Sequence, residues 1–122
     1  MAMYLLPENV ARQDGTGAVI ALETVRGKEL LLTLGITRSI EQESLEISIW
    51  GSSDRERWRL LETFPRKFYC GSYSLMLDLK RHADLRYLRA QWKMSRWGGL
   101  ETVPLFGFHL LVEEPKLQAV GA

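Results

Sequence analysis

The chain has 122 residues, a charged fraction of 25% and a formal net charge of +1, so it is long enough for one domain with its own core and too balanced for a dedicated nucleic-acid binder. No run approaches the ~18 consecutive apolar residues of a membrane-spanning helix. The single cysteine, Cys70, excludes an internal disulfide and is typical of a reducing compartment. We therefore expect a single domain over residues 1–122, with a short flexible tail from about residue 114, in the cytoplasm.

Charge is distributed unevenly along the chain. Between Ser52 and Gly98 there are eleven Lys and Arg against five Asp and Glu, whereas the remainder carries a net charge of −5. Such asymmetry indicates an anionic partner, or the basic part of one molecule meeting the acidic part of another in an assembly.

Short segments in which apolar residues recur with period two follow one another along the chain, separated by turn residues. In chain order they are Met3–Leu6, Ala18–Glu23, Leu30–Ile36, Leu45–Trp50, Trp58–Thr63, Ser74–Leu79, Leu85–Met94 and Val103–Glu113. No segment keeps a 3.6-residue period over three turns. The sequence therefore predicts an all-β fold, an antiparallel β-sandwich or jelly roll of about eight strands.

The boundaries follow from turn chemistry. Pro7 should end the first strand, and Pro65 should mark an edge strand or an irregular crossing, because proline cannot donate to a ladder. Arg26–Lys28 should be the hairpin turn before Leu30–Ile36. That strand is apolar on one face and only partly polar on the other, so we expect it deep in a sheet.

The stretch Leu45–Trp58 organises the chain. Its strand leads into the turn Gly51–Asp54, and Trp58 restarts the pattern on the returning strand. We assign Trp58 and Trp92 to the core. In the last strand the inward positions are Phe106, Phe108, Leu110 and Val112.

The turn motif resembles a known family. In LEISIWGSSDRERW a strand is followed by Ser, Asp and Trp, and Arg86-Tyr87-Leu88-Arg89 comes some thirty residues later, as in the discoidin-like domains of the galactose-binding-like superfold. The resemblance covers residues 30–112 and implies a jelly-roll sandwich that binds sugars, lipid headgroups or proteins without chemistry. Arg55 stands where that family has a turn glycine, and the family's ligand-loop residues have no counterpart here.

A second resemblance is to small β-sandwich proteins of tailed-phage particles. Gly15-Thr16-Gly17, Leu30–Leu34, Ser53–Trp58 and Arg86–Trp92 follow the order of that group's motifs. This resemblance covers more of the chain and implies an assembly role, with a virion particle as an alternative location.

Few residues suggest chemistry. His82 and His109 lack the Cys, His or carboxylate spacing of a metal site, so we read His82 as a solvated loop residue and His109 as an outward strand residue. A Cys70–His109 pair has no supporting motif, and a packed thiol is the default interpretation. Asp54 stabilises its turn in the simplest interpretation, against an acid pair with Glu56. We expect no enzyme, no cofactor and no metal.

Aromatic residues are the candidate binding groups, because exposed rings supply contact area at low entropic cost. They form a candidate platform or interface composed of Trp50, Phe68, Tyr69, Tyr73 and Trp97. The competing interpretation is that loops bury them as lids over the ends of the sandwich.

A basic set accompanies them, composed of Arg86, Arg89, Lys93 and Arg96. It could track a nucleic-acid backbone, but such charges more often solvate a sheet face or protect an edge, so nucleic acid is the third interpretation. The leading hypothesis is a non-catalytic module for protein–protein or structural assembly, by self-association or with a protein partner. The alternative is a discoidin-like carbohydrate-binding module with a glycan partner.

Overall fold

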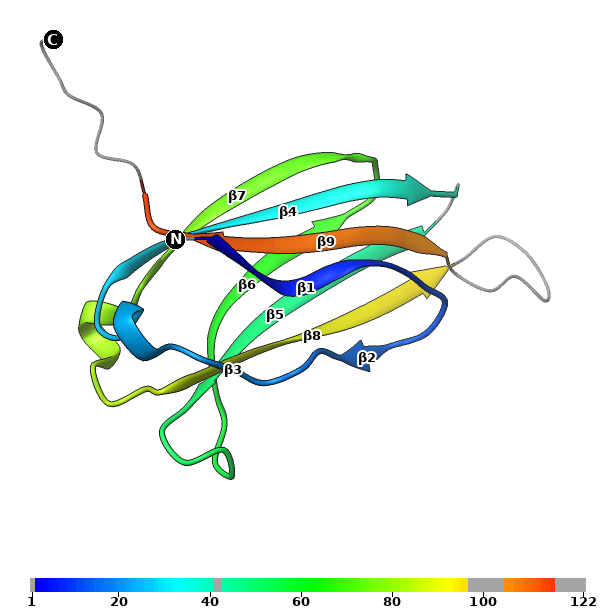
Figure 1. The fold of residues 1–122 in the computed structure, drawn as a ribbon. Helices are drawn as coiled ribbons and strands as arrows, with labels where there is room; N and C mark the ends of the chain where they lie inside the picture. The colour runs from blue at the N-terminus through cyan, green and yellow to red at the C-terminus, as the bar shows by residue number, and fades with distance from the viewer. Residues whose placement is uncertain (1, 41–42, 97–104, 116–122) are drawn as a thin grey trace, which may run out of the picture.

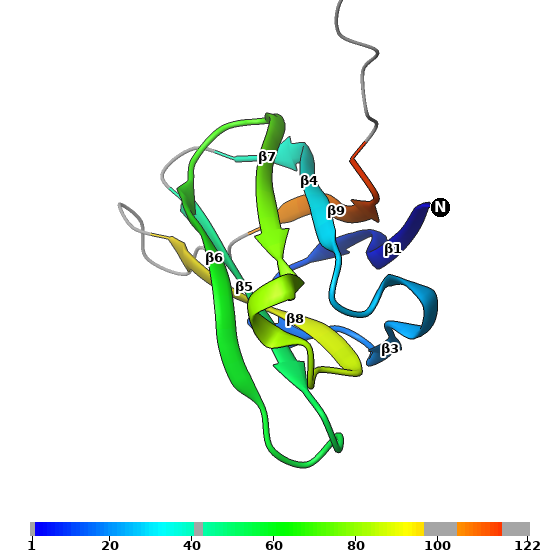
Figure 2. The same ribbon diagram turned by 90° about the vertical axis from the view of Figure 1, so that its left-hand side faces the viewer.

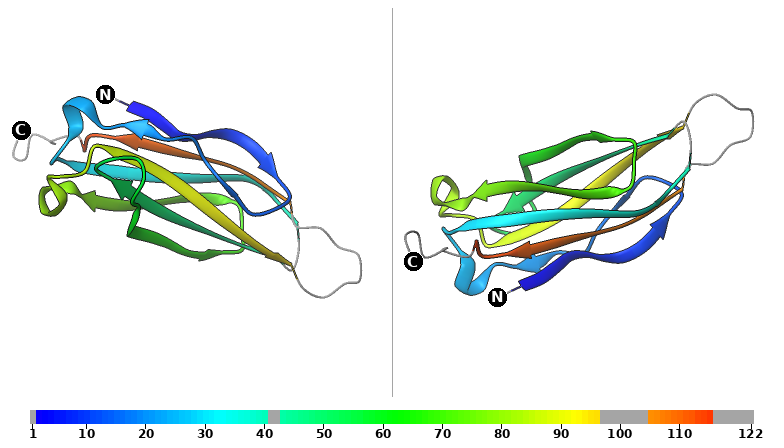
Figure 3. Two further views of the ribbon diagram at one scale, coloured as in Figure 1. Left: turned by 90° about the horizontal axis from the view of Figure 1, so that it is seen from below. Right: turned by 90° about the horizontal axis from the view of Figure 1, so that it is seen from above.

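Two antiparallel sheets face each other across one apolar core, as the computed structural model shows for residues 2–40, 43–96 and 105–115 (Figure 1). Sheet A has the order β1 (Ala2–Ala11), β9 (Phe106–Glu113), β4 (Glu29–Ser39) and β7 (Gly71–Asp78). Sheet B has the order β2 (Gly15–Thr16), β8 (Tyr87–Arg96), β5 (Glu43–Ser52) and β6 (Arg59–Lys67), and β3 (Ile20–Ala21) also pairs with β8. The two layers are separate in Figures 2 and 3. The all-β sandwich predicted from the sequence is confirmed.

Alternation along each strand fills the core. Successive side chains of a strand point to opposite faces, so every second residue of a strand enters the space between the sheets. The four inward positions predicted for β9 are all buried, with exposed fractions of 1% or less. They meet buried residues of β4, β5 and β8, namely Leu30, Leu32, Leu34, Leu45, Ile47, Ile49, Leu88 and Ala90.

Strand β4 lies inside sheet A, with β9 on one side and β7 on the other, as predicted. Its second face, made by Leu31, Thr33 and Gly35, points away from the core, and no strand of the described chain covers it. The partly apolar second face of this segment therefore belongs to a central strand whose outer side is not covered by another described strand.

Pro7 and Pro65 lie in edge strands. The prediction that Pro7 ends the first strand is wrong, because β1 continues to Ala11. Its pairing with β9 shifts register between Leu6 and Asn9, and this irregularity accommodates a residue without an N–H group. Pro65 lies in β6, which is an edge strand of sheet B as predicted.

The hairpin predicted at Arg26–Lys28 is wrong. Strand β3 belongs to sheet B and β4 to sheet A, so the segment between them crosses from one sheet to the other through the short 3-10 helix η1 (Glu23–Val25). Leu22 and Val25 are fully buried on this crossing. The connection therefore closes one end of the core instead of turning back in the same sheet.

Other connections follow the expectation more closely. Strands β5 and β6 form the predicted hairpin, and the charged loop after β7 contains the 3-10 helix η2 (Leu79–His82), whose first turn is capped by the Asp78 side chain. Trp92 packs against the core while half-buried. Trp58 does not join the core, so that assignment is wrong. Strand β8 continues to Arg96, and the residues of the predicted tail from residue 116 on lie outside the described part of the chain.

Candidate functional site

In the β5–β6 hairpin turn, one hydroxyl and one carboxylate accept backbone N–H groups. Ser52 Oγ accepts from the N–H groups of Asp54, at 3.1 Å, and Arg55, at 2.9 Å. Asp54 Oδ1 accepts from the N–H groups of Glu56 and Arg57 at 2.9 Å each and from Ser52 Oγ, also at 2.9 Å. These bonds from Arg57, Glu56 and Ser52 hold the pKa of the Asp54 carboxyl below its ordinary value of 3.8. The interpretation of Asp54 as a turn-stabilising residue is confirmed.

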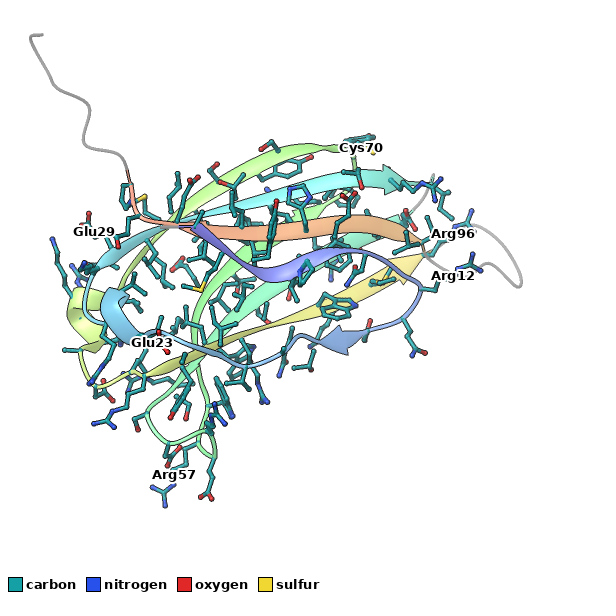
Figure 4. The ribbon with its side chains drawn as sticks, viewed as in Figure 1. Arg12, Glu23, Glu29, Arg57, Cys70 and Arg96 are labelled. Atoms are coloured by element: carbon teal, nitrogen blue, oxygen red, sulfur yellow. The ribbon has the colours of Figure 1, made fainter. Side chains whose placement is uncertain are left out.

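Two cation–π contacts join this turn to strand β8. Arg55 adopts a positive φ of 69°, the conformation a turn glycine would take, and its guanidinium lies 4.6 Å from the centre of the Tyr87 ring. The guanidinium of Arg89 lies 4.2 Å from the centre of the Trp58 ring. Figure 4 shows the hairpin projecting from the body of the sandwich, with Arg57 at its tip.

Trp50 lies on the outer face of sheet B, beside this arrangement. It is paired with Arg89 of β8 and with Leu60 of β6, and its Nε1 donates to Ser48 Oγ at 2.9 Å. Trp50 is half-buried and Leu60 is 53% exposed. Trp50 is thus available for contact, as part of a mixed aromatic and cationic surface.

The other predicted aromatics gather at the corner between β6 and β7. Phe68 is 42% and Tyr69 is 75% exposed, and their rings lie 6.5 Å apart. The Tyr73 hydroxyl donates to the Tyr69 carbonyl at 2.8 Å, and Lys67 Nζ lies over the Tyr73 ring. This corner and Trp50 lie at opposite ends of β6, so the predicted platform is divided. Trp97 lies outside the described residues.

The predicted basic set is also divided. Arg89 and Lys93 lie opposite Trp50 and Glu46 of β5, on the outer face of sheet B. Arg86, just before β8, and Arg96, its last residue, fall at alternate positions, so they do not extend this face. Figure 4 shows Arg96 and Arg12 at the same end of the sandwich, away from Glu29.

The predicted reactive groups occupy separate places. Cys70 is exposed, which contradicts the packed thiol, and its Sγ lies 3.6 Å from Ser39 Oγ. His109 contacts Tyr4, with ring centres 5.9 Å apart in an edge-to-face arrangement. His82 is half-buried, and its Nδ1 lies 3.2 Å from an Arg59 nitrogen. Among the residues that the structure describes, no group of three His, Cys, Asp or Glu is placed to hold a metal ion.

A hollow lies at the turn between β1 and β2. It has a volume of about 440 Å³, and its walls include Asn9, Arg12, Asp14 and Trp92. Trp92 Nε1 donates to the Gln13 carbonyl there at 2.9 Å.

Within the described ranges, no helix has the length and apolar character needed to cross a bilayer.

The outer face of sheet A is the surface that sequence reasoning missed. We define the sheet A face by seven central outward residues of its four strands, which lie between Ser74 and the carboxylates Glu29 and Asp78 on the same side: Tyr4, Leu31, Thr33, Met76, His109, Leu111 and Glu113. Tyr4 is 54% and Met76 is 46% exposed, and the others are half-buried. Glu113 is the one acidic residue in this set. Across the sheet, Leu111 lies between Tyr4 and Thr33.

A raised ring and a hollow lie on either side of Leu111 on this face. A Cβ atom built on Gly35 would lie 2.3 Å from His109 Cε1, so the imidazole occupies the space that a side chain at Gly35 would need. On the other side of Leu111, a hollow of about 360 Å³ is lined by Leu31, Glu113, Glu114 and Pro115. The signal for this surface was present in β4, whose second face is only partly polar.

Comparison with known proteins yields likeness in fold alone. No protein-family model matches the chain, and no curated protein matches it. Among solved structures, the chain is similar to a chain of infectious bursal disease virus, Gx strain, with a TM-score of 0.62 and 7% identity, over 92% of this chain and 30% of that chain. It is similar to the SPBc2 prophage-derived protein YomS, with a TM-score of 0.53 and 12% identity, over 93% of this chain and 92% of that one.

A third similar structure is that of the Gt strain of infectious bursal disease virus, with a TM-score of 0.50 and 10% identity, over 93% of this chain and 32% of that chain. The chain therefore spans about a third of the length of the virus chains it matches and nearly the whole length of the prophage protein. These neighbours agree with the β-sandwich fold. The discoidin-like resemblance is not confirmed.

Proposed function

We propose that this chain is a non-catalytic structural subunit that acts by protein–protein contact and associates with further copies of itself. The observation that carries the proposal is the sheet A face, where Tyr4 and Met76 are about half exposed and Leu31 and Leu111 lie between them. An uncovered apolar sheet face is typical of a surface that is buried in an assembly. The virus and prophage neighbours support the same class of role, and they favour a virion particle over a purely cytoplasmic location.

The absence of an enzymatic role is part of this proposal. Asp54, the best acid candidate of the sequence, is occupied by the hydrogen bonds of its own turn. Cys70 and His109 contact different residues, Ser39 and Tyr4. These side chains therefore have structural surroundings, and none of them forms the nucleophile–base pair that hydrolytic chemistry uses.

The alternatives have less support. A sugar platform would need Trp50 and Tyr69 side by side, whereas they lie toward opposite ends of β6. A nucleic-acid surface would need one continuous basic stripe, whereas Arg86 and Arg96 point differently from Arg89 and Lys93. A charge-driven assembly is also weakened, because Lys80 of the basic stretch pairs within the same chain with Glu29, at 3.8 Å.

Light scattering coupled to size exclusion tests the proposal. We expect a mass above the 14.0 kDa of one chain that rises with protein concentration and persists in high salt, because contact between apolar faces is not screened by ions. A mass of 14.0 kDa at every concentration, up to hundreds of micromolar, would overturn the proposal. Dissociation in high salt would indicate that the copies contact each other through the charged surface of sheet B instead of the sheet A face.

A further inference from the structure

We propose that two copies of this chain pack their sheet A faces together about a twofold axis that runs across the strands at Leu111 and Thr33. The inference rests on the proposed function and names the surface and the partner, which is a second copy of the same chain. Such an interface is isologous, so each residue of the face must find a suitable counterpart from the same face of the other copy.

The register of sheet A determines which residues would meet. Leu111 and Thr33 are paired neighbours, and Gly35 lies beside His109 while Leu31 lies beside Glu113. A twofold axis across the strands keeps each strand opposite its own copy and reverses its direction. Leu111 then faces Leu111, His109 faces Glu113, and Gly35 faces Leu31.

The His109 imidazole and the Glu113 carboxylate are complementary in this orientation, as an N–H donor and an acceptor. His109 and Glu113 lie two residues before and two residues after Leu111 on the same side of β9. A reversed strand therefore brings the imidazole of each copy opposite the carboxylate of the other, twice per dimer. With the copies in parallel orientation, Glu113 would face Glu113, which is unfavourable in a poorly hydrated interface.

The shape of the face follows the same symmetry. The His109 ring lies over Gly35 on one side of Leu111, and the hollow of about 360 Å³ beside Leu31 and Glu113 lies on the other side. In the reversed orientation the ring of one copy is directed into the hollow of the other. Packed sheets lie about 10 Å apart with their strands roughly aligned, a spacing at which such side chains interdigitate.

The choice of sheet A over sheet B follows from charge. Strand β8 places Arg89 and Lys93 on the outer face of sheet B, and two copies of that face would oppose like charges. The acidic residues at one end of sheet A do not oppose each other as unpaired like charges, because they pair within the chain. Glu29 pairs with Lys80 at 3.8 Å, and Asp78 pairs with Arg81 at 3.9 Å.

Two leucines on opposite sheets provide a matched first test. Leu111→Lys places a charge at the axis, whereas Leu60→Lys places the same charge on sheet B at a residue that is 53% exposed. We expect sedimentation to show a dimer for the unsubstituted chain and for Leu60→Lys, and a shift of Leu111→Lys to monomer at the same concentration. Urea unfolding of both variants shows whether each is folded. A folded Leu111→Lys variant that remains dimeric would overturn the inference.

A charge swap tests the orientation. His109→Glu and Glu113→His each remove one half of the proposed pair, and we expect each alone to weaken the dimer about tenfold, which corresponds to about 1.4 kcal/mol. The double variant exchanges the two partners and should regain most of the affinity. Equal weakening in the double variant and the single variants would show that the two residues do not face each other.

Cross-linking gives a result that is independent of stability. In a Cys70→Ser background, Thr33→Cys places one thiol of each copy beside the axis, and Ser48→Cys places it on sheet B. We expect a short bismaleimide to join Thr33→Cys into dimers and to leave Ser48→Cys monomeric on a denaturing gel. The opposite pattern would overturn the inference while the proposed self-association stands, whereas a chain that is monomeric throughout would overturn both.

Discussion

The guanidinium carbon of Arg89 lies 4.2 Å from the centre of the Trp58 ring, on the outer side of sheet B. The ring is also held by a hydrogen bond from its Nε1 to the Arg55 carbonyl, at 3.1 Å. The guanidinium of Arg89 stacks on the ring, while its Nε atom is buried and has no hydrogen-bond partner among the described residues. Trp58 therefore stabilises the hairpin from the outside and does not fill the core.

Truncation of Trp58 should lower the free energy of unfolding less than truncation of a buried tryptophan does. We expect Trp58→Ala to lower the free energy of unfolding by about 1 kcal/mol, well below the roughly 3–5 kcal/mol of a buried aromatic residue. Urea unfolding of Trp58→Ala, Arg89→Ala and the double variant measures the coupling, which should be about 0.5–1 kcal/mol. A loss as large as that of a core residue would contradict the surface position.

The left-handed backbone of Arg55 predicts a difference between two small substitutions. Both Arg55→Gly and Arg55→Ala remove the contact with Tyr87, but alanine retains the unfavourable positive φ of 69°. We therefore expect Arg55→Gly to be more stable than Arg55→Ala by about 1 kcal/mol, as measured by urea unfolding. Equal stability of the two variants would indicate that the turn relaxes to a negative φ.

The Asp54 carboxylate should make the stability of the folded chain depend on pH in the acid range. The pKa of Asp54 is lowered in the folded chain, so its contribution is fully present above its ordinary value of 3.8 and is lost as the pH falls from there through the lowered folded value. Asp54→Asn keeps an acceptor oxygen but does not titrate in this range. Thermal unfolding measured between pH 6 and pH 2 should show a smaller acid loss for Asp54→Asn than for the unsubstituted chain, and an identical profile would contradict this role.

Glu43 is a structural carboxylate that the sequence reasoning did not single out. It is 1% exposed, and its two oxygens accept from the backbone N–H groups of Ile40, at 2.6 Å, and Leu105, at 2.8 Å. We expect Glu43→Ala to lower the free energy of unfolding by about 1–3 kcal/mol, because two N–H groups lose their acceptor. Glu46→Ala, on the outward side of the same strand, is the matched control and should change it by less than about 0.5 kcal/mol in urea unfolding.

Sequence reasoning predicted local features well and groupings poorly. The inward residues of β9 and the Asp54 turn follow from neighbouring residues alone, and both are confirmed. The aromatic platform and the basic stripe required residues from different strands to meet on one surface. Trp50 and Tyr69 are separated by the length of β6, and Arg86 alternates away from Arg89, so neither grouping forms as predicted.

The sequence alone predicts which residues of each strand point inward and which point outward, because the direction of a side chain depends only on its position along the pleated backbone. The open face of β4 was decided by tertiary structure. Residues Leu31 and Leu111 come from strands far apart in the chain and become part of one surface only because β9 inserts between β1 and β4. Strand order depends on the sum of many long-range pairings, and no local pattern specifies it.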